Sequence, residues 1–129
     1  MNKREVDKKI PDAYKVLNDV KIVKDKDEKG IVIDGKIKRG WRGQIASFGA
    51  AVAMGSLLSA VSFFSSQGSA ELPRELLIKA LESLIKKDNL HEYIMDSMKE
   101  KPSHEHIVKE EIMNATIALK LAMNLYDME

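Results

Sequence analysis

Apolar residues recur at helical spacing over most of the chain, and the first such stripe lies near the N-terminus. It follows Pro11, a residue type that is tolerated at the first position of a helix. The pattern predicts that a helix begins near Ile10 or Pro11. The residues before Pro11 then form either a separate turn or an extension of the helix across a kink. The stripe comprises Ala13, Val16, Leu17, Val20 and Val23.

The segment after this stripe is charged and lacks helical periodicity. Lys24–Gly30 is predicted to be a solvated loop, and Ile31–Ile33 a short extended piece. Asp34-Gly35 favours a tight turn. The extended piece is too isolated in the sequence to predict a sheet. Residues 24–36 are therefore expected to be a flexible or turn-containing insert.

The central part of the chain predicts two helices, over Trp41–Met54 and Leu57–Ser66, separated by a break at Gly55-Ser56. A helix with Pro73 in its first turn comes next and ends near Lys86-Lys87, where the helix dipole favours cations. Its apolar stripe comprises Leu76, Leu77, Ala80, Leu81, Leu84 and Ile85.

Two further helices are expected in the C-terminal part. Leu90–Lys101 is amphipathic and stops before Pro102. Ser103 is predicted to cap a long final helix. The buried face of that helix is expected to comprise Ile112, Ala115, Ile117, Ala118, Leu119, Leu121, Ala122 and Leu125.

Together with these predicted elements, the length and composition of the chain indicate its fold class. The chain has 129 residues, of which 44% are hydrophobic, and this is the size of one domain. We expect residues 1–129 to form an all-α, compact single-domain bundle of about five or six helices. The sequence contains no cysteine, which excludes disulfides, thiolate zinc sites and cysteine nucleophiles.

The longest uncharged stretch, Gly43–Ala70, is long enough for a membrane helix to be considered. It carries small residues at helical spacing, a pattern that membrane helices use for close packing. The break at Gly55-Ser56 favours instead a buried helical hairpin of two shorter helices. The small residues are Ser47, Ala51, Gly55 and Ser59.

The net charge of +1 hides an asymmetry. Residues 1–42 contain thirteen Lys and Arg against eight Asp and Glu, whereas residues 43–129 contain eight against twelve. Such a split is typical of a chain whose basic end faces a polyanion; the alternative is a helical protein whose exposed faces differ in charge by chance. Met1–Lys9 is polar and has no features of a signal peptide, so a cytoplasmic location is expected.

The motifs that could carry catalysis are incomplete. Gly30–Lys36 fits the first seven positions of a phosphate-binding loop, but Ile37 stands where a Mg²⁺-binding Ser or Thr is needed. A metal-dependent enzyme using His91, His104 and His106 is the least favoured alternative, because residues at i and i+2 point to different faces of a helix. We therefore expect no enzymatic activity, no metal and no cofactor.

One cluster stands out: Lys36–Arg42 contains four cations, no acid and the only tryptophan of the chain. These cations would lie at the N-terminus of a helix, where the dipole disfavours them and the free amides bind phosphate. We interpret the cations as ligand-binding groups. Trp41 could stack on a base, but a role as a core anchor is favoured.

Gly49–Gly68 (GAAVAMGSLLSAVSFFSSQG) carries a resemblance to a known family. A basic, aromatic-containing helix start, an apolar helix, a Gly55-Ser56-Leu57 break and a helix ending in a glycine loop are similar to the small-subunit family of the type III-B CRISPR effector, the Cmr complex. A basic N-terminal helix and a final helix like Ala115–Tyr126 extend the likeness to most of the chain. The sequence departs from the family at Ser62 and Phe64, around Phe63, and in the insert Asp25–Asp34.

The resemblance implies a non-catalytic helical bundle, several copies of which stack along the guide RNA–target RNA duplex while other subunits cut. It implies guide and target RNA, other Cmr subunits and further copies of the chain as partners, and no membrane. The alternative is a protein–protein adaptor whose Gly43–Ala70 surface docks a partner helix without contacting RNA. The residues expected to contact phosphates are Lys8, Lys9, Lys15, Lys36, Lys38, Arg39 and Arg42.

Overall fold

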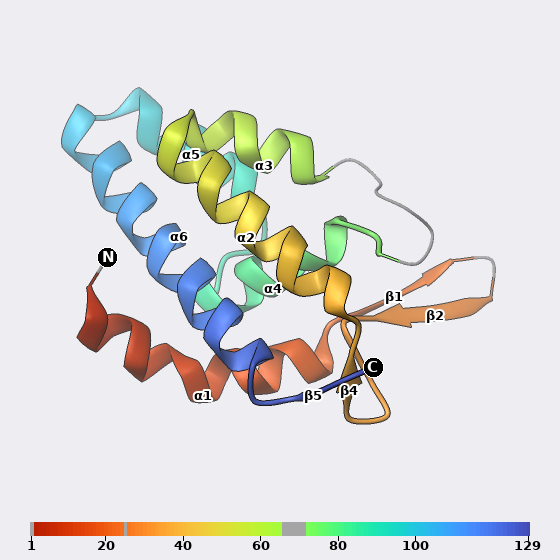
Figure 1. The fold of residues 1–129 in the computed structure, drawn as a ribbon. Helices are drawn as coiled ribbons and strands as arrows, with labels where there is room; N and C mark the ends of the chain where they lie inside the picture. The colour runs from red at the N-terminus through yellow and green to blue at the C-terminus, as the bar shows by residue number, and fades with distance from the viewer. Residues whose placement is uncertain (1, 25, 66–71) are drawn as a thin grey trace.

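The computed structural model describes residues 2–24, 26–65 and 72–129. These residues form six helices and five short strands, which confirms the predicted all-α bundle of five or six helices (Figure 1). In chain order the elements are α1 Lys3–Asp19, β1 Lys21–Lys24, β2 Asp27–Gly30, β3 Val32–Ile33, β4 Lys36–Ile37, α2 Arg39–Met54, α3 Leu57–Ser65, α4 Glu75–Ile85, α5 Leu90–Lys99, α6 Pro102–Met123 and β5 Asp127–Met128.

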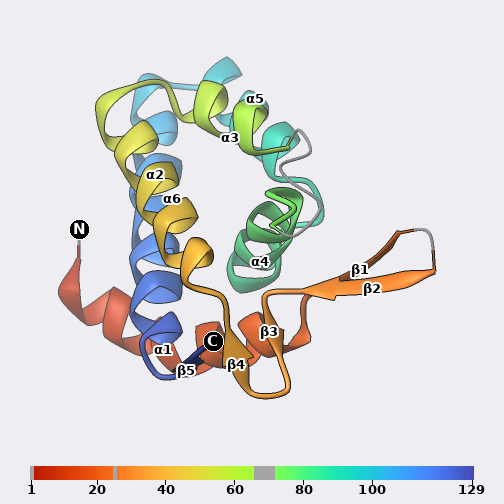
Figure 2. The same ribbon diagram turned by 45° about the vertical axis from the view of Figure 1, so that its right-hand side comes forward.

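The long helix α6 is the centre of the bundle, because α1, α2, α4 and α5 all pack against it (Figures 1 and 2). Alanines allow the neighbouring helices to approach α6 closely. The predicted buried face is correct at Ile112, Ala115, Ala118, Leu119 and Ala122.

The same prediction is wrong at three positions. Ile117 is only partly buried, and the exposed fractions of Leu121 and Leu125 are 39% and 62%. Leu125 lies beyond the end of α6 at Met123, so the helical periodicity no longer applies to it.

Helix α1 begins earlier than predicted. Asn2 is its N-cap, and the side chain of Asn2 accepts a hydrogen bond from the backbone N–H of Glu5 at 3.2 Å. The backbone N–H of Asn2 in turn donates to Oδ1 of Asn114 on α6, at 3.0 Å. Pro11 therefore lies inside the helix, and the predicted start there is wrong, whereas the alternative of an N-terminal extension is confirmed.

The segment between α1 and α2 forms strands, which corrects the predicted loop and the expectation that no sheet forms. β1 and β2 pair antiparallel as a hairpin that projects from the bundle (Figure 2). Because α1 ends at Asp19, Val23 falls in β1 and is 70% exposed instead of continuing the helical stripe. The hairpin carries an ion pair between Lys21 and Glu28, with an N···O distance of 3.1 Å.

A second sheet joins β3, β4 and β5. The predicted turn at Asp34-Gly35 connects β3 to β4, and both turn residues have positive φ, 54° and 76°, as a tight hairpin turn requires. β5, from the C-terminal end, pairs parallel to β4. The backbone N–H of Glu129 extends this pairing by donating to the carbonyl of Ile37 at 2.9 Å.

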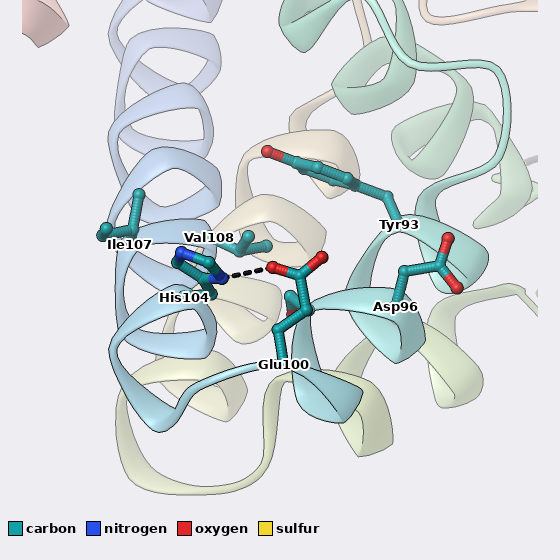
Figure 3. A pocket seen from close by; sticks show the side chains of 7 residues that line it. Tyr93, Asp96, Glu100, His104, Ile107 and Val108 are labelled. Carbon is teal, nitrogen blue, oxygen red and sulfur yellow. Dashed lines mark ion pairs between the residues drawn. The ribbon is translucent and has the colours of Figure 1, made fainter.

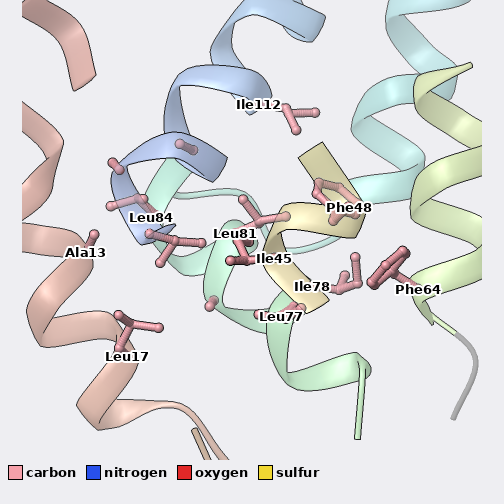
Figure 4. Close-up of a cluster of buried hydrophobic side chains, with 14 of the residues drawn as sticks. Ala13, Leu17, Ile45, Phe48, Phe64, Leu77, Ile78, Leu81, Leu84 and Ile112 are labelled. Atoms are coloured by element: carbon pink, nitrogen blue, oxygen red, sulfur yellow. The ribbon is translucent and has the colours of Figure 1, made fainter. Parts of the chain in front are cut away.

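The expected break at Gly55-Ser56 is confirmed, because α2 ends at Met54 and α3 begins at Leu57. The inner side chains of α2 and α3 meet in the core, where the Phe48 and Phe64 rings pack edge to face with centroids 5.2 Å apart (Figure 4). Within the part of the chain that the structure describes, no helix is long and apolar enough to cross a membrane. Ser66 and the rest of Gly43–Ala70 beyond Ser65 lie outside the described residues.

Several helix ends differ from the predicted ones. α4 begins at Glu75, so Pro73 precedes the helix. α5 ends at Lys99, two residues before the predicted Lys101. α6 begins at Pro102, because proline suits the first helical position, and Lys101 rather than Ser103 is its N-cap.

Candidate nucleic-acid interface

The N-terminus of α2 is an uncapped helix end surrounded by cations. The N-cap residue Lys38 makes no side-chain hydrogen bond to the helix, and the first turn contains no acidic residue. By contrast, asparagine side chains cap α1 and α5, and α4 and α6, which also lack a side-chain cap, each have an acidic residue in the first turn. The first amides of a helix have no acceptor within it. The backbone N–H groups of Arg39 and Gly40 are therefore available to an anion.

The interior of the first turn holds this helix end in place. Trp41 is fully buried, with an exposed fraction of 0%, so its interpretation as a core anchor is confirmed and it is not available to stack on a base. Gly40 allows a close approach, because a Cβ at this position would lie 2.4 Å from Cδ1 of Leu72. With Trp41 directed inward, the side chains of Arg39 and Arg42 are exposed.

Among the described residues, the cations at the start of α2 form no ion pair. Within residues 2–24, 26–65 and 72–129, Lys8 is the one predicted phosphate ligand that forms an ion pair, with Glu5 at 3.8 Å. Both groups of that pair are exposed, with side-chain exposures of 67% and 47%, so it contributes little to stability. Lys8, Lys15, Lys36, Arg39 and Arg42 are exposed, whereas Lys9 and Lys38 are half-buried.

The structure brings the predicted residues together in two groups. Lys36 on β4, Lys38 at the N-cap, and Arg39 and Arg42 in the first turns of α2 lie at one end of the bundle (Figure 1). Lys8, Lys9 and Lys15 are on α1, which packs mainly against α6 and α4.

Lys15 lies nearer to the α2 group than the other two α1 lysines do. Its neighbour Tyr14 stacks on Tyr126, with ring centroids 4.2 Å apart and an angle of 6° between the planes. Tyr126 directly precedes β5, which pairs with β4. The second half of α1 is thereby joined to the strand that carries Lys36, whereas Lys8 and Lys9 belong to the half nearer the N-terminus.

Sequence reasoning missed a further lysine in this region. Lys29 on β2 lines a small cleft of about 80 Å³ together with Lys36 and Lys38. The carboxylate-bearing residues Glu28 and Glu129 line the same cleft. No sequence signal predicted this grouping, because it depends on the hairpin of β1 and β2, which lacks a regular hydrophobic pattern.

The other candidate chemistries have no assembled site among the described residues. No group of three His, Asp or Glu side chains there is arranged to hold a metal ion. His104 forms an ion pair with Glu100, its i−4 neighbour across the turn between α5 and α6. Gly30–Lys36 runs from the end of β2 through β3 and its hairpin turn into β4, so Lys36 lies in a strand and not at the start of a helix, where a phosphate-binding loop places its lysine.

Comparison of the chain with protein-family models, with curated proteins and with solved structures finds no match.

Proposed function

We propose that this protein is the non-catalytic small subunit of a CRISPR RNA-guided RNA-silencing complex of the Cmr type. In this role it stacks in copies along the guide–target RNA duplex and contacts phosphates through its basic surface. The observation that carries the proposal is the uncapped N-terminus of α2, where four cations have no carboxylate partner within the described residues. The sequence resemblance described above supports the same assignment.

The chemistry of this helix end suits a phosphate. A phosphate oxygen placed before the first turn accepts hydrogen bonds from the free amides of Arg39 and Gly40. The side chains of Arg39 and Arg42 neutralise its charge, and an arginine can do so with two parallel hydrogen bonds. Such contacts fix the protein on the backbone but carry no information on base sequence. Sequence specificity then comes from pairing between guide and target.

A single copy contributes only a few such contacts. Stacking several copies along one duplex converts later binding events into intramolecular ones, which raises the overall affinity without any new contact. We therefore expect weak RNA binding by the isolated chain and strong RNA retention by the assembled complex.

The test is a charge reversal in the assembled complex. The triple variant Lys38→Glu, Arg39→Glu, Arg42→Glu is compared with the parent after isolation of the native complex through a tag on this chain. We expect the variant complex to lose its RNA while the chain stays folded. The parent should also show a linear fall of log K with log salt, at about 0.7–0.9 per phosphate neutralised, and the variant a slope shallower by about 2 to 3.

A matched control reverses the same number of charges elsewhere. Lys79, Lys99 and Lys120 are exposed lysines on α4, α5 and α6, and their reversal to Glu changes the net charge equally. This control should retain RNA. Equal RNA retention by the α2 variant and the parent, or equal loss in both triple variants, would contradict the proposed interface.

The alternative is a helical adaptor that binds protein and not RNA. The outward face of α2 favours it, because this face carries no charge after Arg42 and ends in Met54, which is 90% exposed. Under this alternative the assembled complex has no RNA affinity even at about 50 mM salt, a condition in which phosphate contacts are strong. The same isolation experiment therefore distinguishes the two functions.

A further inference from the structure

A pocket of about 330 Å³ lies between α5 and α6, away from the basic end of the bundle. Three of its lining residues occupy one face of α5, at the helical spacing of three and four residues, and a fourth, Glu100, is the C-cap residue of this helix. The other three come from the first turns of α6 (Figure 3). In chain order the lining residues are Tyr93, Asp96, Ser97, Glu100, His104, Ile107 and Val108.

The base of the pocket is apolar in character. Val108 and Ser97 are buried, and the Ser97 hydroxyl donates to the carbonyl of Ile94 at 2.6 Å, so this donor is already satisfied. Ile107 adds an aliphatic wall that is 62% exposed. An aliphatic chain in the pocket would therefore meet hydrocarbon on two sides.

Tyr93 covers the pocket with an aromatic ring held in a fixed position. Its hydroxyl donates to Oε1 of Glu111 at 2.6 Å. Nζ of Lys87 lies 4.6 Å from the ring centroid and does not line the pocket, so it covers the outer face of the ring. The other face lies over the pocket, above Glu100 (Figure 3). This ring already binds one cation, as the negative face of an aromatic ring does.

A carboxylate side chain lies opposite the ring. Oε2 of Glu100 pairs with Nδ1 of His104, while its second oxygen points beneath the Tyr93 ring (Figure 3). Asp96, one turn earlier on α5, lies at the rim and forms no ion pair with any residue that the structure describes. An aromatic face, an open carboxylate oxygen and an aliphatic wall thus converge on one space.

We propose that this pocket binds a guanidinium group on an aliphatic stem. The group is planar, so it stacks on the inner face of Tyr93 while its N–H groups donate to Glu100. An ammonium group carries the same charge but has no flat face to stack, so it binds more weakly here. The guanidinium comes from an arginine side chain of a protein partner or from a small free compound, and the two sources share this chemistry.

The experiment titrates the full chain with four probes while the NMR signals of Ser97 and Val108 are followed. N-acetyl-argininamide represents a protein side chain, and agmatine represents a free guanidinium compound. N-acetyl-citrullinamide has the shape of arginine without the charge, and N-acetyl-lysinamide has the charge without the plane. We expect both guanidinium probes to bind with dissociation constants of about 1 mM, and the citrulline probe not to bind. Tighter binding of the argininamide assigns the site to a protein partner, and tighter binding of agmatine assigns it to a free compound.

Two glutamate substitutions, one in α5 and one at its C-cap, provide the matched comparison. Glu100→Gln removes the facing charge and should weaken guanidinium binding about tenfold, as expected for a hydrogen bond to a charged group. Glu92→Gln makes the same chemical change at an exposed position outside the pocket, and its affinity should equal that of the parent. The proposal is overturned if the citrulline probe binds as well as arginine does, if Glu100→Gln leaves the affinity unchanged, or if no probe shifts these signals at about 10 mM.

Discussion

Besides its pairing with β4, the C-terminal strand is joined to α1 through Tyr126, and removing the hydroxyl of this tyrosine tests how the basic end is held. Tyr126 is 9% exposed, and its hydroxyl donates to the backbone carbonyl of Tyr14 at 2.6 Å. Tyr126→Phe keeps the ring stack and loses this hydrogen bond. We expect the free energy of unfolding to fall by about 0.5–1.5 kcal/mol near neutral pH. Tyr126→Ala loses the ring as well and should lower it by about 3–5 kcal/mol.

The pH dependence of the same variant makes the test sharper. Burial, followed by the neighbouring Tyr14 and Asp19, raises the pKa of Tyr126 from its ordinary 10 to about 12. Below pH 10 the hydroxyl is protonated in both the folded and the unfolded chain, so its full contribution to stability is present. Between pH 10 and 12 the unfolded chain loses the proton before the folded one does, so stability falls as the pH rises. Phenylalanine does not titrate and escapes this loss.

Urea unfolding of the parent and of Tyr126→Phe, measured from neutral to alkaline pH, checks both the loss of stability near neutral pH and its dependence on pH. We expect the parent to be more stable near neutral pH, and its advantage to shrink above pH 10 and to be reversed before pH 12. The pKa of Tyr93 is also raised to about 12, by burial and by Glu111, but this tyrosine is present in both proteins and leaves the difference unaffected. A constant difference between the two proteins from pH 8 to 12 would refute the inferred burial of the hydroxyl.

Three further predictions concern α2. The emission of Trp41, the only tryptophan, should be blue-shifted and should not change on addition of RNA, because the indole is fully buried; strong quenching by RNA would contradict its core position. Gly43→Ala should raise the free energy of unfolding by about 0.5–1 kcal/mol in urea melts, because alanine is the better helix former. No atom lies within 4 Å of the added Cβ, and a destabilised variant would mean that this surface is already occupied. Replacement of Lys38, Arg39 and Arg42 by Gln should stabilise the isolated chain by about 1 kcal/mol, since cations near a helix N-terminus oppose its dipole. A fall in stability would instead assign these side chains a role in the fold.

The parts of the fold that follow from local periodicity could be predicted from the sequence. The C-terminal end of α2 and the break before α3 are predicted correctly because apolar spacing, Gly55 and an uncharged run all indicate them, whereas α2 begins at Arg39, two residues before the predicted Trp41. The start of α1 was missed because Pro11 suggested a beginning, whereas the cap at Asn2 is stabilised by Asn114 on α6. That contact joins distant parts of the chain, and no local pattern indicates it.

The sheets could not be predicted for a related reason. β3 and β4 are each two residues long, too short for an alternating pattern to be visible. They are completed by β5, from the other end of the chain. The candidate site likewise contains residues that the sequence could identify and one that it could not. The cluster Lys36–Arg42 is continuous in the sequence and could be identified there, whereas Lys29 joins it only through the hairpin.

The position of the basic cluster is an argument for a ligand. Four cations at the N-terminus of α2 face the positive end of the helix dipole, and no acidic residue in the first turn offsets them. An exposed cation in the first turn, such as Arg39 or Arg42, opposes folding of the isolated chain by a few tenths of a kcal/mol. Cations that served only solubility could stand at any exposed position, where they would not oppose the helix dipole. Phosphate at this helix end reverses the sign of each contribution, because it interacts favourably with the dipole, the free amides and the side chains together. The cluster lowers the stability of the free chain and would raise that of the phosphate-bound chain. Its position is therefore better explained by binding than by folding.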